Sequence, residues 1–382
     1  MFRRLSIAAA ALLISAPPAV QARPSAQPPV ARDFKNWSVV CDNTKRCVAE
    51  GGNDDIDDAR TRIVMRLARD AGPDAQPSLE LFASAPLDLR AARTDGQPFD
   101  AVPAEWHASA GKTDDDVYPF RIRTSDPATI DAWLATSRNT QMLSFGDPAA
   151  TQAPRLSLSG LNAALLLIDD TQGRIGTTTA LLRKGTRPAS SVPVAPALPP
   201  APVPAPPAPA LTAAEQRPIV DAVFDRFAAS VKRCAADADD EMSASDRRKA
   251  ATATALSADD AIVSIPCQTS SAYNRTDLWY RARRTAPYAP TPIDFGENAS
   301  AGLDPASRSN ELTQAIYDPA SATLWSLVRL RSAGDCGSSA SWVFDGKRFV
   351  LNDVAMHGTC NGVLPDLWPR LYRTAGATNT PR

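Results

Sequence analysis

The sequence of 382 residues is poor in the residues and motifs that most catalytic centres need. It has two histidines, His107 and His357, and it has no CxxC pair, GxSxG elbow, P-loop, GxGxxG fingerprint or HExxH motif. Zinc, iron–sulfur, dithiol-redox, phosphate-loop and dinucleotide sites therefore lack their usual ligands, and no cofactor is predicted. A Ser-His-Asp hydrolase would have to join His357 to Ser338, Ser339 or Ser341 without a nucleophile elbow. We interpret His357 as a loop histidine beside a disulfide.

Long apolar runs and an excess of one charge are missing as well. After residue 22 no stretch reaches the roughly 18 consecutive apolar residues that indicate a membrane span, so no transmembrane segment is predicted. The formal net charge is −1, with both signs mixed along the chain. Nucleic-acid binders usually carry a basic stripe, so that class is excluded.

What is present at the start of the chain predicts export. Residues 1–4 (MFRR) are basic, residues 5–16 are apolar, and small side chains stand at Val20 and Ala22. This pattern is typical of a secretory signal peptide, here residues 1–22, cleaved after about Ala22. We expect a secreted, periplasmic protein of the bacterial envelope.

Proline is concentrated in one segment. Residues 188–209 carry no charge and no glycine, with proline at nearly every second or third position. Such a segment favours an extended polyproline-II spacer of roughly 3.1 Å per residue. The sequence therefore predicts a β-rich N-terminal domain at 33–186, a Pro/Ala-rich linker at 187–210 and an α+β domain at 211–376.

Short β-prone runs with turn signals dominate both halves, and helices are few. Asp126 and Pro127 begin a predicted helix that runs to about Ser137, and Ser159 can cap a second helix that Gly173 ends. Strands are predicted at 37–41, 46–50, 61–70, 78–84, 119–123, 140–145 and 155–159, and then at 261–267, 277–283, 312–318, 323–330, 341–345 and 347–353. The fold class is α+β, with two β-rich domains and peripheral helices.

A third helix is predicted near the start of the second half. Thr212 and Glu215 can form a capping box, but Pro218 would then lie inside the helix, so we expect a break or a later start. In the last third, Asp345-Gly346 between two aromatic runs is a strong hairpin signal.

Six cysteines in an exported chain predict three disulfides and no reactive thiol, although six cysteines allow 15 pairings. Pairing within each half is the simplest arrangement, because bonded Cα atoms must lie within about 7 Å. The expected bonds are Cys41 with Cys47, Cys234 with Cys267, and Cys336 with Cys360.

Acidic runs at 53–58 and 114–116 raise the alternative of calcium binding. The calcium-loop pattern requires glycine at its sixth position, where Asp58 stands. We interpret both runs as solvated turns, so no metal ligands are predicted.

One strand offers a candidate binding surface. Trp279, Arg281 and Arg283 alternate on one face, and Tyr288 follows nearby. Arginine beside aromatic rings suits an anionic sugar or a protein partner. Cross-strand packing with exposed arginines is the competing interpretation.

Four segments carry a family resemblance: WSVVCDNTKRC, SIPCQTSSAYN, GDCGSSASWVFDGKRFVLND and CNGVLPDLWPRLYR. Together they resemble the bacterial exported family known as domain of unknown function number 1176, which has six characteristic cysteines. The first half separately resembles invasion-associated locus B proteins, through residues 37–41 and SLSGLNAALLLIDD. Neither resemblance implies a reaction or a catalytic residue.

The sequence thus predicts a periplasmic, disulfide-stapled protein of the cell envelope that acts by binding an envelope protein or a wall polymer rather than as an enzyme. One alternative is an envelope hydrolase that uses two carboxylates. Another is an inhibitor-like module that plugs an enzyme with a rigid loop.

Overall fold

A computed structural model describes residues 29–52, 61–99, 106–110, 117–146, 153–236, 242–271, 273–296 and 309–377. The predicted signal peptide and both acidic runs lie outside these ranges. The described chain is built mainly of four antiparallel sheets with a few helices, so the α+β prediction is confirmed.

The first half forms a seven-stranded sheet, the N-terminal sheet. In sheet order its strands are β1 (Val30–Phe34), β2 (Trp37–Cys41), β3 (Cys47–Gly52), β4 (Ile63–Arg69), β5 (Pro77–Ala83), β9 (Phe120–Thr124) and β8 (His107–Ala110). Because side chains alternate between the two faces of a strand, Val39, Met65 and Leu81 point into one core, and Val64 and Phe82 point into another. Both faces of this sheet are therefore covered.

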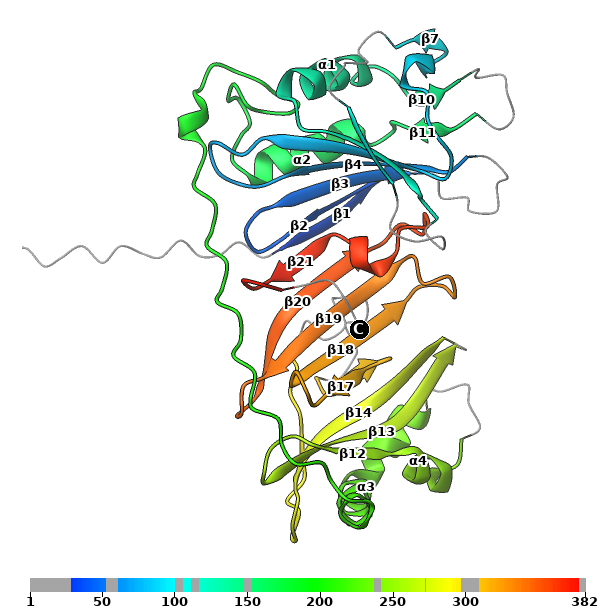
Figure 1. The fold of residues 1–382 in the computed structure, drawn as a ribbon, viewed down its shortest axis with the longest axis vertical. Helices are drawn as coiled ribbons and strands as arrows, with labels where there is room; N and C mark the ends of the chain where they lie inside the picture. Colours follow the sequence, from blue (N-terminus) through cyan, green and yellow to red (C-terminus); the bar gives the residue numbers. More distant parts are fainter. Residues whose placement is uncertain are drawn as a thin grey trace, which may run out of the picture.

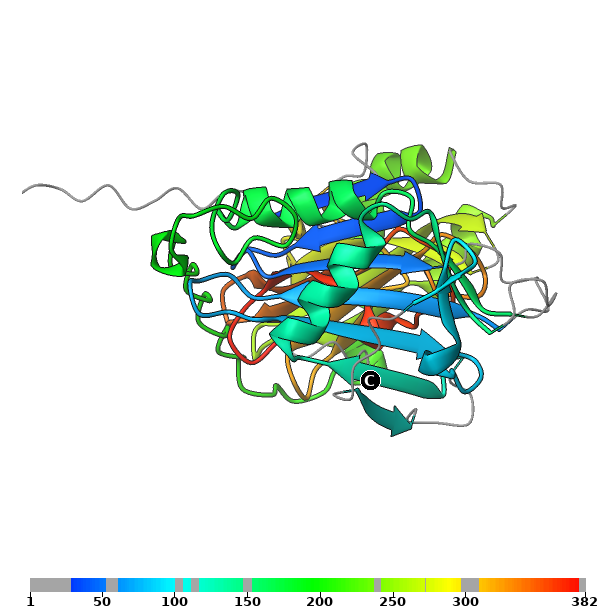
Figure 2. The same ribbon diagram turned by 90° about the horizontal axis from the view of Figure 1, so that it is seen from above.

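Two helices and a small sheet cover the first of these faces (Figure 2). They are α1 (Pro127–Ser137), α2 (Leu161–Thr171) and the strands β11 (Arg155–Ser157), β10 (Met142–Phe145), β6 (Ala92–Thr94) and β7 (Gln97–Pro98), with a short 3₁₀ turn η1 (Leu89–Ala91). Asp126 caps α1 through the backbone N–H of Thr129, as predicted.

The predicted cap of α2 is wrong by one residue. The capping position is Gly160, with φ of 104°, and no side chain caps this end. A Cβ at Gly160 would lie 1.8 Å from the carbonyl oxygen of Phe34. The close approach of the helix start to β1 therefore requires glycine at the position where Ser159 was expected to act.

The second half contains two five-stranded sheets. The distal sheet has β12 (Thr252–Ala255), β13 (Asp260–Ser271), β14 (Asn274–Arg283), β15 (Thr291–Pro292) and β16 (Glu311–Thr313). The central sheet has β17 (Ile316–Asp318), β18 (Thr323–Arg329), β19 (Gly337–Phe344), β20 (Phe349–His357) and β21 (Arg370–Arg373), with η3 (Pro365–Leu367) before β21. The Asp345-Gly346 turn joins β19 to β20 as predicted, with Gly346 at φ of 94°.

The single strand predicted at 312–318 is instead two strands in different sheets. Gln314 between them has φ of 45°, and its N–H donates to the carbonyl of Arg275 at 2.8 Å. This left-handed residue turns the chain from the distal to the central sheet, a change of direction that the alternating pattern does not encode.

The distal sheet carries α3 (Ala213–Ala236) and α4 (Ala244–Ala250). The expected break at Pro218 is wrong, because the helix runs through it and the capping box of Thr212 and Glu215 forms. Pro218 lies early in the helix, where the capping box anchors the first turn. The backbone leaves helical geometry later, at Phe227 (φ −114°, ψ 19°).

The elements stack in layers (Figure 1). Helices α1 and α2 lie on the N-terminal sheet, which packs on the central sheet, which packs on the distal sheet, and α3 and α4 close the other end. The two halves of the chain therefore touch directly through the N-terminal and central sheets.

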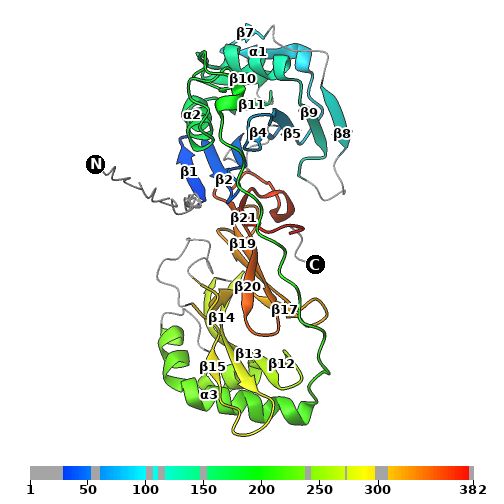
Figure 3. The same ribbon diagram turned by 90° about the vertical axis from the view of Figure 1, so that its left-hand side faces the viewer.

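The proline-rich segment runs along the side of this stack rather than between the halves (Figure 3). After the 3₁₀ turn η2 (Ala189–Ser191), the Pro199 carbonyl accepts from the N–H of Ala375, and the N–H of Ala205 donates to Phe344, both at 2.8 Å. The segment is thus tied to the central sheet at two points. The boundaries of the domains at 33–186 and 211–376 stay a prediction.

Candidate functional site

The six cysteines form the same three disulfides that the sequence predicts, and none is free. Cys41 and Cys47 stand directly opposite each other on β2 and β3. Cys234 ties α3 to β13, and the third bond, Cys336–Cys360, joins the start of β19 to the segment after β20. All three bonds connect neighbouring elements of the fold, which is the arrangement of structural staples.

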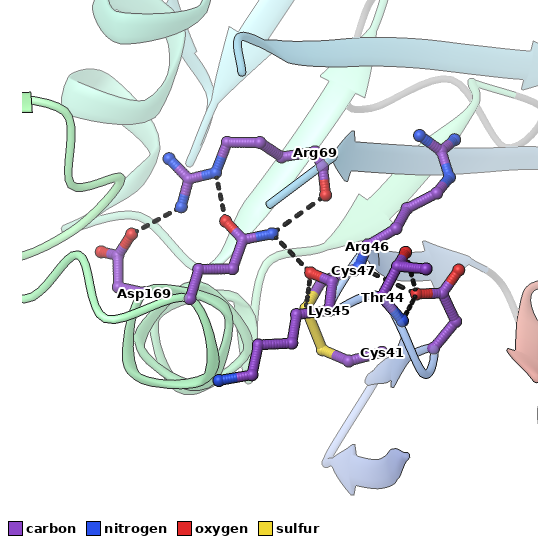
Figure 4. Close-up of a disulfide and its surroundings, with 9 residues drawn as sticks. Cys41, Thr44, Lys45, Arg46, Cys47, Arg69 and Asp169 are labelled. Atoms are coloured by element: carbon purple, nitrogen blue, oxygen red, sulfur yellow. Dashed lines mark hydrogen bonds and ion pairs between the residues drawn. A yellow bond between two sulfur atoms is a disulfide. The ribbon is translucent and has the colours of Figure 1, made fainter. Parts of the chain in front are cut away.

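Figure 4 shows that the Cys41–Cys47 bond adjoins a buried polar network. Arg69 is 1% exposed and donates to Asp169 and to the side chain of Gln172, both at 2.8 Å. Gln172 in turn donates to the carbonyl of Lys45, in the turn that the disulfide closes. Burial, followed by the charge of a neighbouring guanidinium, lowers the pKa of Arg69 to about 10. The network fixes the turn against the C-terminal end of α2.

The four residues of the predicted binding surface do not form one surface in the structure. Trp279 is 5% exposed and lies in the core between the distal and central sheets, whereas Tyr288 packs on the core beneath α3. Arg281 and Arg283 share the carboxylate of Asp260, at 2.5 and 3.4 Å. Arg281 lines a cavity formed by described residues.

That cavity, which we call the basic pocket, has a volume of about 470 Å³ and lies beside the β19–β20 turn. Its main lining side chains are three cations and three phenylalanines: Arg281, Lys347, Arg348, Phe295, Phe344 and Phe349. The rings form one cluster, with centroids 5.4 to 5.5 Å apart. The pocket therefore combines an apolar floor with a cationic rim.

Arg281 is held in place on three sides. It binds Asp260, donates to the carbonyl of Lys347 at 2.7 Å and lies over the ring of Phe344, 5.6 Å from its centroid. By contrast, Lys347 and Arg348 are exposed and make no salt bridge with a described residue. A fixed guanidinium beside two exposed cations can bind an anionic group, while the phenylalanines, 1 to 8% exposed, make the floor of the pocket apolar.

Sequence reasoning missed most of this pocket. It identified Arg281 but did not consider Lys347 and Arg348. The available signal was the turn Asp345-Gly346-Lys347-Arg348, which places two consecutive cations directly between aromatic strands. That Arg281 from β14 would meet this turn depends on packing between two sheets.

The second polar site lies in the junction between the N-terminal and central sheets. Its apolar part is formed by both halves of the chain and comprises Val64, Phe82, Tyr118, Ala355, Val363 and Trp368. Beside them, the side chains of Glu50 and His357 are each 1% exposed. His357 Nε2 lies 2.5 Å from Glu50 Oε1, although 307 positions separate the two residues in sequence. Arg66 and Asn361 also bind Glu50.

Both ring nitrogens of His357 face hydrogen-bond acceptors. Its Nε2 faces the carboxylate of Glu50, and its Nδ1 lies 3.1 Å from the carbonyl oxygen of Asp335. Burial alone would raise the pKa of Glu50, but Arg66 and His357 outweigh it and hold that pKa well below its usual range. His357 is the buried last residue of β20, so the interpretation as a loop histidine is wrong.

This arrangement leaves His357 no role as a hydrolytic base, because neither ring nitrogen bonds a serine. Among the described residues, no group of His, Cys, Asp or Glu side chains is arranged to hold a metal ion. No helix in the described ranges combines the length and apolar character needed to cross a bilayer.

These features define a class of protein: a layered α+β protein, stapled by three disulfides, with a basic pocket and a buried ionic junction. A family model described as "Protein of unknown function (DUF1176)" matches residues 31–375, so the chain belongs to this family, as its cysteine segments predict. It is 32% identical over 355 residues to "Uncharacterized protein YpfG" of Escherichia coli (strain K12), covering 91% of this chain and 93% of that protein. No solved structure matches the chain. The resemblance to invasion-associated locus B proteins stays a prediction.

Proposed function

We propose that the protein is exported to the periplasm, loses residues 1–22, and acts there as a non-enzymatic binding protein whose ligand site is the basic pocket. Three disulfides support export, because such bonds persist in oxidising compartments. The observation that carries the binding role is the fixed guanidinium of Arg281 beside Lys347 and Arg348 above a floor of phenylalanine rings.

The ligand that suits this pocket is an anionic sugar segment of an envelope polymer. A volume of about 470 Å³ fits a small ligand rather than the broad contact of a protein partner. The cations suit its carboxylate or phosphate, and the apolar floor formed by the nearly buried Phe344 and Phe349 tolerates the carbon skeleton of a sugar.

The rival reading as a carboxylate-dependent hydrolase has less support. Glycoside hydrolysis requires two carboxyl groups about 5 to 9 Å apart across the bond that breaks. Among the described residues that line the basic pocket, Asp294 is the one carboxylic acid. Binding without turnover fits this lining better.

The test is calorimetric titration of the oxidised chain lacking residues 1–22 with soluble peptidoglycan fragments that carry free carboxylates. We expect binding that weakens with salt, and at least ten-fold weaker binding for the double variant Lys347→Glu/Arg348→Glu, because each lost charge-assisted bond contributes about 1.5 kcal/mol or more. Both side chains are exposed, so the fold should persist.

The matched control is Lys232→Glu, an exposed lysine on α3 far from the pocket in sequence, which should bind as the parent does. Fragments that fail to bind the parent protein, or that bind the double variant equally well, would refute the proposal. Release of cleaved sugar would favour the hydrolase instead.

A further inference from the structure

A second cavity, which we call the arginine groove, opens at the junction between the two halves. It has a volume of about 390 Å³, and four arginines line it. Arg46, in the β2–β3 turn, and Arg66, on β4, come from the first half, whereas Arg370 and Arg373 come from β21. The ring of Trp368 and the carboxylates of Asp42 and Asp366 complete the polar and aromatic lining.

Buried carboxylates hold three of these guanidinium groups in place. Arg66 binds Glu50 at 2.5 Å, Arg373 binds Asp42 at 2.6 Å and Arg370 lies 3.2 Å from Asp353. The three carboxylates are 1 to 5% exposed in their side chains; Glu50 and Asp353 lie behind the groove surface, whereas Asp42 is part of its lining. The arginines are thus positioned before any ligand arrives, which lowers the entropic cost of binding.

Hydrogen-bond donors remain for a ligand after these pairs are made. Arg46 uses one Nη for Asp70, so its Nε and second Nη stay available. Arg66 binds Glu50 through Nε and one Nη, and Arg373 uses Nε for Asp42 and one Nη for Thr44, which leaves one Nη on each. Planar guanidinium donors of this kind match the oxygens of phosphate and carboxylate groups.

Both like and opposite charges act on Arg370 in the groove. Burial lowers its pKa, the carboxylates of Asp353 and Asp42 raise it, and the charges of Arg373 and Arg46 lower it. An anion in the groove would act on Arg370 in the same direction as these carboxylates.

We propose that the arginine groove is a second binding site, for a compact multivalent oxyanion of the phosphate or polycarboxylate type, which Arg46 and Arg66 of one half and Arg373 of the other hold together. Because its donors come from both halves, the bound anion stabilises their junction. The site is independent of the basic pocket, which lies toward the other face of the central sheet.

The experiment is calorimetry of the full oxidised chain with sodium pyrophosphate and, separately, sodium citrate at low ionic strength. We expect at least one of the two anions to bind and to raise the thermal unfolding midpoint as its concentration increases. The anion that binds more tightly identifies the phosphate or the carboxylate class.

Arg46→Ala is the diagnostic variant, and we expect it to weaken anion binding at least ten-fold. Arg46 is 38% exposed and pairs with an Asp70 that is 63% exposed, so its loss should scarcely affect folding. The matched control Asp70→Asn keeps the Arg46 side chain in the groove and should bind at least as tightly as the parent. Lys347→Ala, in the basic pocket, should also leave anion binding unchanged.

Three results would overturn the inference. They are the absence of binding by either anion to the parent protein, binding by Arg46→Ala as tight as that of the parent, and a loss of binding in Lys347→Ala, which would place the anion in the basic pocket.

Discussion

The central sheet is packed on both faces, and different interactions hold the two interfaces together. Toward the distal sheet the contact is apolar and rich in aromatic rings, with Trp342, Phe349 and Phe295 within ring-centroid distances of 5.3 to 5.5 Å. Toward the N-terminal sheet a smaller apolar cluster adjoins the buried Glu50, which binds both Arg66 and His357. The interface within one half of the chain relies on apolar area, whereas the interface between the halves also relies on charge pairing.

The difference has consequences for how each interface responds to change. An apolar core tolerates substitutions that conserve volume, usually at a cost below about 1.5 kcal/mol. A buried ion cluster loses its balance when one member is removed, because the remaining charges stay buried without compensation. We therefore expect the junction to be the more demanding of the two interfaces.

The largest effect is expected at the junction. Glu50→Gln removes the buried carboxylate that Arg66, His357 and Asn361 bind, and we expect a loss of about 3 to 5 kcal/mol in the free energy of unfolding. Urea denaturation of the oxidised protein measures it. Two further substitutions serve as comparisons. Leu324→Met, in the aromatic interface, should lower the free energy of unfolding by less than about 1.5 kcal/mol. Glu80→Gln lies on the same sheet as Glu50 but is only partly buried, so it should lower that free energy by about 0.5 kcal/mol or less. Equal costs for Glu50→Gln and Leu324→Met would remove the distinction between the interfaces.

Urea denaturation should also show which of two disulfides, one in each half of the chain, contributes more to the free energy of unfolding. Removing Cys336–Cys360, which closes a separation of 24 residues, should cost about 3.5 kcal/mol by loop-closure entropy. Removing Cys41–Cys47, with a separation of 6, should cost about 2.4 kcal/mol. Paired Cys→Ala variants and their urea midpoints would check the order, and a reversed order would mean that folded-state contacts outweigh chain entropy.

A pH dependence at the edge of the junction should be similar in size to the loss of the Cys41–Cys47 bond. Burial raises the pKa of Asp353 to about 6, although Arg370 and Arg373 counteract it. Between about pH 4 and pH 6 the folded state therefore keeps a proton that the unfolded state releases, so rising pH destabilises the fold by roughly 2 to 3 kcal/mol through this group. Glu50 acts with the opposite sign, because its lowered pKa contributes stability that is lost as pH falls below about 4.5.

Asp353→Asn should remove the destabilising slope between pH 4 and pH 6 while the Glu50 contribution remains. Urea midpoints at half-unit pH intervals would reveal the change in slope. An unchanged profile would show that Asp353 is ionised throughout this range in the folded protein.

Most strands and the disulfide pairs were predictable because their signals are local. β2 matches its predicted bounds of 37–41, and Cys41 pairs with Cys47 directly across the hairpin. The elements that sequence reasoning missed are short or sit at sheet edges, such as β1, β6 and β21. Their few residues give no clear alternation, and partners elsewhere in the chain decide their pairing.

The candidate sites were predictable only in part. Arg281 was identified from its strand, but its neighbours Lys347 and Arg348 lie in the turn between β19 and β20 of another sheet. The polar side chains of Glu50 and Arg66 resemble the solvent face of a strand, and nothing nearby in sequence indicates that a second sheet covers them.

By itself, the sequence determined the α+β class, the family, the hairpins and the three staples, because alternation, turn residues and cysteine spacing act over a few to some tens of residues. Only the tertiary structure decided that Glu50 meets His357 and that arginines of both halves line one groove. Those contacts depend on how whole sheets dock, which is set by the summed shape and charge of faces built from distant segments.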